Sequence, residues 1–198
     1  MTLILASGSA TRRAMLEAAG VSFAIVRPQV DEDAAKASLR AEGLGPRDLA
    51  DALAELKALR VSAQSGTALV LGCDSVVALA DGTTLDKPED RDAARRQLGV
   101  LSGTSHDLVS AAVIAHHGRA IWRHVDRARL HVRPLSNAFI DSYLDAEWPA
   151  IAGCVGGYRV EGRGAQLFSR IDGSHFTILG LPLLPLLDFL RVRGEMTA

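Results

Sequence analysis

The sequence has few cysteines, no long uninterrupted apolar run and almost no net charge, and each shortage argues against a class of protein. Cys73 and Cys154 are the only cysteines in 198 residues, so the chain cannot build a disulfide framework, and their spacing matches no metal-binding motif. The nearest approach to a membrane span, residues 177–190, is short and is interrupted by Pro182 and Pro185. The formal net charge of -1 argues against bulk nucleic-acid binding.

Two further motifs are missing. The chain has no Gly-x-x-x-x-Gly-Lys-Ser/Thr segment, which argues against a P-loop enzyme acting on a terminal phosphate. Its first residues lack the basic, apolar and small-residue layout of a secretory signal. We therefore expect a cytoplasmic protein with two reduced thiols that acts on a small molecule, without a nucleic acid or a membrane as partner.

The composition is that of a globular protein, with 48% hydrophobic and 23% charged residues. Residues 1–198 are long enough to bury a sizeable core, and no linker or repeat divides them, so we expect a single domain. Strand-like and helix-like stretches mix along the chain, which predicts an α/β fold with a mixed sheet. Helices are expected over 11–20, 46–66, 88–103, 136–147 and the C-terminal part of 177–194, whereas 30–45 is expected to be mostly irregular.

A serine-rich turn followed by two arginines stands where a strand is expected to pass into a helix, in LASGSATRR at residues 5–13. The N–H groups and the dipole of a helix N-terminus favour an anion at such a turn. Ser7 and Ser9 add hydroxyl donors, and Arg12 and Arg13 add planar guanidinium groups that suit phosphate oxygens. The stretch predicts a phosphate-binding loop, although taken alone it also fits a capped surface helix with two solvated arginines.

Charged residues further along fit the same chemistry, because phosphate chemistry usually needs a divalent cation and a carboxylate. Asp74 ends an apolar strand, a usual place for a site residue. Glu32 belongs to the acidic cluster 31–33, which could help to hold a metal or could be a solvated loop. Lys87, which precedes a proline, and Lys57, which lies among apolar helix positions, could neutralise phosphate or extend to solvent.

Together these motifs resemble the Maf family, nucleoside triphosphate pyrophosphatases once described as septum-formation inhibitors. The resemblance covers essentially the whole chain and rests on these stretches in this order: LASGSATRR, VDED, LAELKA, GCDSVV, DKPED, LSGTSHDLVSAAV and ILGLPL. It implies a fold similar to that of the inosine-triphosphate pyrophosphatases, a mixed β-sheet with flanking helices and two lobes around a central cleft. It also implies cleavage between the α- and β-phosphates of a nucleotide, a divalent cation (Mg²⁺ or Mn²⁺) and a homodimer.

Position by position, the resemblance implies roles for individual residues. The family's phosphate-binding positions correspond to Ser7, Ser9, Arg12, Arg13, Lys57 and Lys87. The family's catalytic base corresponds to Asp74, and Glu32 would be a metal ligand or a second residue that positions water. Asp74 and Glu32 would together hold the metal, and the sequence leaves open which of the two is the base.

The chain departs from the common family pattern at several positions. Thr11 stands where a proline often precedes the arginine pair, and Asp86 stands where a glycine is usual, which places a negative charge beside Lys87. In CVGGYRVEGRGAQLF, Cys154 and Glu161 replace the lysine and glutamine of the branch that acts on dTTP and UTP. In this the chain is more similar to the branch that hydrolyses 7-methyl-GTP.

Glu161 also has a chemical argument for base specificity. An ionised carboxylate only accepts hydrogen bonds, and guanine offers N1–H and its 2-amino group as adjacent donors. Methylation at N7 adds positive charge, which favours an anionic partner further. We therefore expect a guanine-type substrate such as 7-methyl-GTP; the alternatives are dTTP or UTP, or a non-catalytic nucleotide-binding regulator of cell division.

Overall fold

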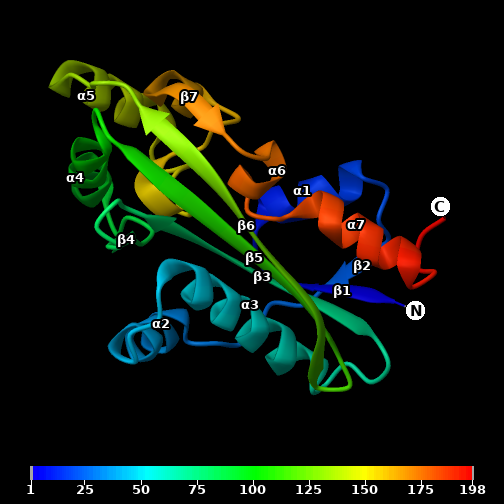
Figure 1. Ribbon diagram of the computed structural model, residues 1–198. Coiled ribbons are helices and arrows are strands. Elements are labelled where there is room, and N and C mark those ends of the chain that lie inside the picture. Colours follow the sequence, from blue (N-terminus) through cyan, green and yellow to red (C-terminus); the bar gives the residue numbers. More distant parts are fainter. Residues whose placement is uncertain (1, 198) are drawn as a thin grey trace.

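The computed structural model describes residues 2–197 and is built on one seven-stranded sheet (Figure 1). The strand order is β2-β1-β3-β5-β6-β7, and the short β4 pairs with β3. The strands are β1 (Leu3–Ala6), β2 (Phe23–Ile25), β3 (Leu69–Ala78), β4 (Thr84–Leu85), β5 (Ser105–His116), β6 (Arg119–Val132) and β7 (Phe168–Asp172). Strand β1 pairs in parallel with β2 and β3, whereas β3, β5, β6 and β7 pair antiparallel, so the predicted mixed sheet is confirmed.

Helices cover both faces of the sheet. The helices are α1 (Ala10–Ala18), α2 (Glu32–Ala41), α3 (Pro46–Ser62), α4 (Arg91–Leu101), α5 (Asn137–Glu147), α6 (His175–Ile178) and α7 (Leu183–Val192). Two 3₁₀ turns, Val155–Gly157 and Arg163–Leu167, lie between α5 and β7. In Figure 1, α2 and α3 lie on one side of the sheet, and α1, α6 and α7 lie on the other.

The close approach of α3 to β3 depends on Gly72. An ideal Cβ at this position would lie 2.1 Å from the Ala54 carbonyl oxygen and 2.6 Å from the Ala58 nitrogen, so no larger residue fits without moving the helix. Ala54 and Ala58 are themselves completely buried. This contact brings Lys57 of α3 next to Asp74 of β3.

The opposite face of the sheet carries two separate apolar cores. On β3, Leu71 and Cys73 belong to the core under α1 and α7, whereas Val77 belongs to the core under α4 and α5. Between them on the same face, Ser75 lies directly opposite Ser110 of β5, and their hydroxyl oxygens are 2.8 Å apart. The two cores form two lobes, and a polar strip divides them.

The structure corrects two expectations of secondary structure. Asp74 lies in the middle of β3 rather than at the end of a strand, because the strand continues past it in register with β5. Residues 32–41 form the helix α2 rather than an irregular loop. Asp31 caps this helix by accepting a hydrogen bond from the Ala34 nitrogen at 3.0 Å, and two acids in its first turn suit the helix dipole. Its apolar face is narrow, with Ala35 and Leu39 packed against the core under α3. The rest of its inner side is held by ion pairs to Asp86, which local spacing does not reveal.

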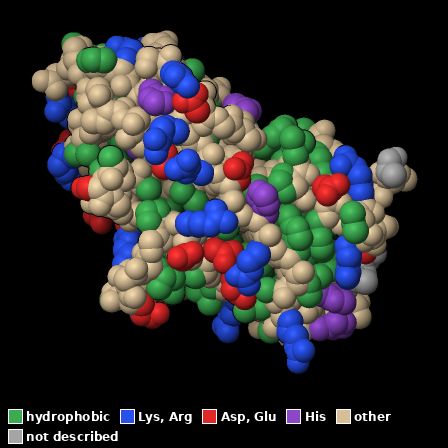
Figure 2. Space-filling model, in the orientation of Figure 1, with side chains coloured by type: hydrophobic (Ala, Val, Ile, Leu, Met, Phe, Trp, Pro, Cys, Tyr) green, Lys and Arg blue, Asp and Glu red, His purple; other side chains and the backbone are tan. Residues whose placement is uncertain are grey.

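The surface mixes charges of both signs, and Figure 2 shows Lys and Arg side chains interspersed with Asp and Glu over the face drawn. Several of these form pairs, such as Arg129 with Asp107 at 2.7 Å. Within residues 2–197, no helix has the length and apolar character that a membrane span requires. Cys73 is buried and Cys154 is half-buried, and neither forms a disulfide.

Candidate active site

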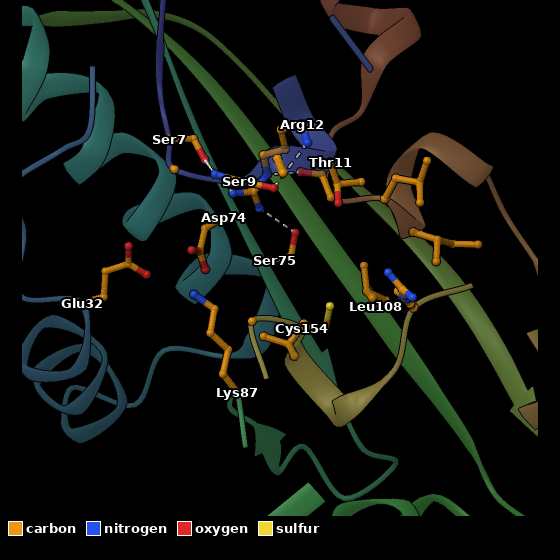
Figure 3. A pocket seen from close by; sticks show the side chains of 18 of the residues that line it. Ser7, Ser9, Thr11, Arg12, Glu32, Asp74, Ser75, Lys87, Leu108 and Cys154 are labelled. Carbon is orange, nitrogen blue, oxygen red and sulfur yellow. Dashed lines mark hydrogen bonds between the residues drawn. The ribbon is translucent and has the colours of Figure 1, made fainter. Parts of the chain in front are cut away.

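A cavity of about 620 Å³ opens where the polar strip meets the two lobes (Figure 3). Its walls come from segments far apart in the sequence: the loop after β1, the start of α2, the middle of β3, the loop after β4, the segment 150–161 and the turn after α6. The predicted site residues that line it are Ser7, Ser9, Arg12, Glu32, Lys57, Asp74, Lys87 and Glu161.

The loop between β1 and α1 forms a compact donor-rich turn. Ser9 is the N-cap of α1, and its hydroxyl accepts a hydrogen bond from the Arg12 nitrogen at 3.3 Å. Ser7 is 6% exposed, and its hydroxyl accepts from the Ser9 nitrogen at 3.1 Å. The loop therefore presents the positive end of a helix to the cavity.

Arg12 is fixed from two sides. Its Nε donates to the Gly180 carbonyl at 2.7 Å, and its Nη2 donates to the Ser75 hydroxyl at 3.0 Å. Ser75 in turn donates to Ser110, because the single Ser110 proton is used on the Thr177 carbonyl at 2.8 Å. This chain of hydrogen bonds holds the guanidinium rigid at the cavity wall.

Arg13 is placed differently from Arg12. It is an exposed residue of α1, and its Nε lies 3.8 Å from Glu17 Oε1 one helical turn later. Arg13 lies outside the set of described residues that line the cavity. The structure therefore brings Arg12, and not Arg13, together with the other predicted site residues.

Two carboxylates share one lysine on one wall of the cavity. Lys57 Nζ lies 2.7 Å from Asp74 Oδ1 and 3.1 Å from Glu32 Oε2. Lys57 and Asp74 are both buried, at 5% exposed each, whereas Glu32 is half-buried. The second oxygen of Asp74, Oδ2, is buried and has no hydrogen-bond partner in the described part of the chain.

The electrostatics keep Glu32 ionised. Burial alone would raise the pKa of Glu32, but the charge and hydrogen bond of Lys57, with the charges of Lys87 and Lys36, hold it below the usual value. Lys87 points from its loop toward Asp74 in Figure 3. The site thus combines ionised carboxylate with several cations, as expected where phosphate must be bound and water activated.

The donor set fits a hard divalent cation. Carboxylate oxygens are the ligands that Mg²⁺ prefers, and the unpartnered Asp74 Oδ2 is an available one next to Glu32. Mg²⁺ commonly uses one or two carboxylates and completes its shell with water and substrate phosphate. Asp31 and Asp33 are both exposed, and Asp31 is used as a helix cap, so of the acidic cluster only Glu32 lines the cavity.

The segment after α5 forms part of the cavity wall. Glu161 is exposed there and shares the lining with Cys154 and Arg159. Glu147, which is 4% exposed, anchors this segment: it accepts from Arg159 Nε at 2.7 Å and from the Arg163 nitrogen at 3.1 Å. The carboxylate of Glu161 is thus carried by a segment tied to α5.

Sequence reasoning missed several lining residues, namely Ser75, Lys36, Arg159 and Gly180. Ser75 directly follows Asp74, so its alternation to the other face of β3 was a usable signal. Gly180 holds Arg12 through its backbone and has φ of +94°, which a sequence does not display. Lys36 lies on α2, in a segment whose local spacing does not indicate a helix.

The family model and the sequence relatives point to one family. A family model described as Maf-like protein matches residues 2–193. A nucleoside triphosphate pyrophosphatase of Ruegeria pomeroyi is 50% identical over 192 residues, covering 97% of this chain and 96% of the relative. One of Caulobacter vibrioides is 51% identical over 193 residues, covering 98% and 96%. A solved HAM1 protein from Coxiella burnetii has a TM-score of 0.46 and 14% identity, covering 67% of this chain and 73% of that one.

Proposed function

Because the chain belongs to the Maf family, we propose that it is a nucleoside triphosphate pyrophosphatase, a hydrolase that converts a nucleotide to its monophosphate and pyrophosphate. The relatives that carry this name are about half identical to the chain over nearly its whole length, which supports the activity directly. The observation that carries the chemistry is Asp74 Oδ2, which has no hydrogen-bond partner within residues 2–197 and whose carboxylate shares Lys57 with Glu32.

In the proposed reaction, water adds across the α–β anhydride bond, and pyrophosphate leaves with the electron pair of the bond to the bridging oxygen. One of the two carboxylates, Asp74 or Glu32, accepts the proton of the attacking water while the other orients that water, and Lys57 holds Asp74 Oδ1 in place. Glu32 is the second carboxylate beside that water. Arg12 and Lys87 neutralise charge that grows on the leaving pyrophosphate.

We assign Asp74 and Glu32 as the residues that would hold a divalent cation, Mg²⁺ or Mn²⁺. When bound, the cation supplies positive charge to the phosphates and lowers the pKa of a bound water. The loop residues Ser7 and Ser9 and the α1 N-terminus bind phosphate oxygens without it. Arg13 contributes only its positive charge, from the exposed surface of α1.

For the base, we propose a guanine-type substrate, and 7-methyl-GTP in particular. Glu161 lines the same cavity as the serine-arginine loop but lies on a different segment of the chain, which supports a role at the base rather than at the phosphates. Its carboxylate suits the N1–H and 2-amino donors of guanine and the positive charge of the methylated ring. Arg159, anchored on Glu147, is the neighbouring donor.

The activity is tested by incubating the purified protein with Mg²⁺ and a panel of ribo- and deoxyribonucleoside triphosphates plus 7-methyl-GTP, and resolving the products by chromatography. We expect monophosphate and pyrophosphate, with turnover lost in Asp74→Asn. Diphosphate and phosphate as products would contradict the proposal, and nucleotide binding without any turnover would favour a regulator.

The base preference has its own test. Glu161→Gln should lower kcat/KM for 7-methyl-GTP at least tenfold relative to UTP, because one guanine donor loses its acceptor. Asp145→Asn, an exposed acid on α5, is the matched control and should leave the ratio unchanged. An unchanged ratio in Glu161→Gln would refute the base assignment and leave the hydrolytic mechanism in place.

A further inference from the structure

Asp86 ties the loop that carries Lys87 to the helix that carries Glu32. Its Oδ1 accepts from Lys36 Nζ at 3.2 Å and from Arg40 Nη2 at 3.0 Å, and its Oδ2 accepts from Arg40 Nη1 at 2.9 Å. Lys36 and Arg40 are successive turns of α2, so one carboxylate receives two cations from one helix.

The two cations are not equivalent. Arg40 already engages both oxygens of Asp86 in the forked geometry that suits a carboxylate, and its Nη2 also donates to the Thr84 hydroxyl at 2.7 Å. Arg40 alone therefore neutralises the negative charge of Asp86. Lys36 adds a second positive charge to the same carboxylate, which leaves the cluster with one in surplus.

Lys36 is also desolvated and incompletely bonded. It is 7% exposed, although an ammonium group carries three donors and is costly to bury without acceptors. In the described part of the chain, Asp86 is the one acceptor recorded for its Nζ. Two N–H groups of a buried cation therefore remain for a ligand or for water.

The position of Lys36 indicates the chemical class of the ligand that it would bind. It lies one helical turn after Glu32 and lines the same cavity, whereas Arg40 does not line it. Its charge is felt at Glu32, where it helps Lys57 and Lys87 to keep the pKa low. A buried cation that lines the same cavity as Lys57 and Lys87 is suited to an anion of high charge density.

We propose that Lys36 is a further phosphate-binding residue of this site, held in place by Asp86 and Arg40, and that it binds the pyrophosphate part of the substrate. The inference deepens the proposed function, on which it rests for the identity of the anion. Asp86 is then a positioning residue, because it holds Lys36 at a fixed distance from the loop that carries Lys87.

The test measures the affinity of the full chain for inorganic pyrophosphate by calorimetry in the presence of Mg²⁺. Lys36→Met should weaken binding by about tenfold or more, the usual effect of losing a charge-assisted hydrogen bond, and Lys36→Arg should restore it to within about threefold. Arg193→Met is the matched control, because it removes one positive charge from an exposed position after α7 that does not line the cavity. Its affinity should stay within about threefold of the wild type.

Three results would overturn the inference: no pyrophosphate binding by the wild type, equal binding by Lys36→Met, or an equal loss in both variants, which would indicate net charge rather than contact. Nucleotide turnover is measured in parallel. If the wild type hydrolyses no nucleotide but binds pyrophosphate in the expected order, the proposed function fails and the assignment of Lys36 stands.

Discussion

Lys57 Nζ lies 2.7 Å from Asp74 Oδ1, and both side chains are almost completely buried. The pair is formed by two elements that the sequence separates, α3 and β3, and it exists because Gly72 lets the helix lie directly on the strand. Lys57 also reaches Glu32 of α2. One cation thus contacts both carboxylates, and it helps to hold the pKa of Glu32 below its usual value.

Lys57→Met should therefore remove activity and stability together. Breaking a buried ion pair costs about 3 to 5 kcal/mol of unfolding free energy. Without Lys57, burial dominates at Glu32, so its pKa rises and the acid limb of the pH–rate profile moves to higher pH. We expect kcat/KM to fall about 100-fold or more. Denaturant titration and the pH profile of kcat/KM measure these effects.

Lys57→Arg is the control for charge. It should recover most of the stability and hold the acid limb near its wild-type position, with partial activity, because the larger guanidinium places its donors differently. A Lys57→Met enzyme with a wild-type pH profile would show that Lys57 does not control the ionisation of Glu32.

Gly180→Ala should impair catalysis by moving Arg12. A Cβ at Gly180 would lie 3.1 Å from Ser75 Oγ and 3.3 Å from Arg12 Nε, and its φ of +94° already disfavours alanine. Small displacements of a binding group commonly cost 10- to 100-fold in rate, so we expect kcat/KM to fall by about that factor. Steady-state kinetics and thermal unfolding are measured on the same preparation.

Gly194→Ala provides the comparison for backbone strain alone. Gly194 has φ of +71° with no atom within 4 Å of its ideal Cβ, so alanine there should lower stability by about 1 kcal/mol and leave kcat/KM unchanged. Equal kinetic effects of the two substitutions would exclude a specific role of the Gly180 contact with Arg12.

Much of the fold could be predicted because its signals are local. The helices expected over 11–20, 46–66, 88–103 and 136–147 are found as α1, α3, α4 and α5, because each has its apolar spacing within its own segment. Helix α2 could not be predicted in this way. Its inner side is completed by Asp86, some 50 residues away, and only the fold brings the two together.

The same difference between local signals and long-range contacts applies to the candidate site. Some residues that line the cavity can be predicted from their side-chain types and their place beside apolar strand segments, as with Ser7 and Asp74. The direction in which neighbouring side chains point cannot be predicted in the same way. Arg12 and Arg13 are adjacent, but the geometry of α1 places Arg12 at the cavity wall and Arg13 on the exposed surface. Asp86, an unusual residue beside Lys87, is now explained by the two cations that it receives from α2.

His106 should make stability depend on pH between about 6.5 and about 4. Burial lowers its pKa from the usual 6.5 to about 4, so in this window the unfolded chain binds a proton that the folded chain does not. Stability therefore rises with pH through the window and is lost as the pH falls, by up to about 3 kcal/mol from this group. Urea unfolding at several pH values measures the slope.

His106→Gln can keep the hydrogen bond to the Tyr158 hydroxyl, which lies 2.7 Å from His106 Nε2, and removes the titrating group. We expect a flatter dependence in this variant. His117→Asn, at the exposed hairpin tip, should keep the wild-type slope. Parallel curves for wild type and His106→Gln would mean that His106 is not the group responsible.

Gly72→Ala tests whether the contact between α3 and β3 determines both stability and the site. The added methyl group would meet the Ala54 carbonyl at 2.1 Å, so the helix must move away, and Lys57 moves with it. Overpacking of this kind costs about 1 to 3 kcal/mol, and more where backbone is in the way. Gly99→Ala, in α4 with open space around its Cβ, should instead stabilise by about 0.5 to 1 kcal/mol. If Gly72→Ala lowered stability but kept full kcat/KM, the spacing of Lys57 and Asp74 would not depend on this contact, and the helix position would matter for folding alone.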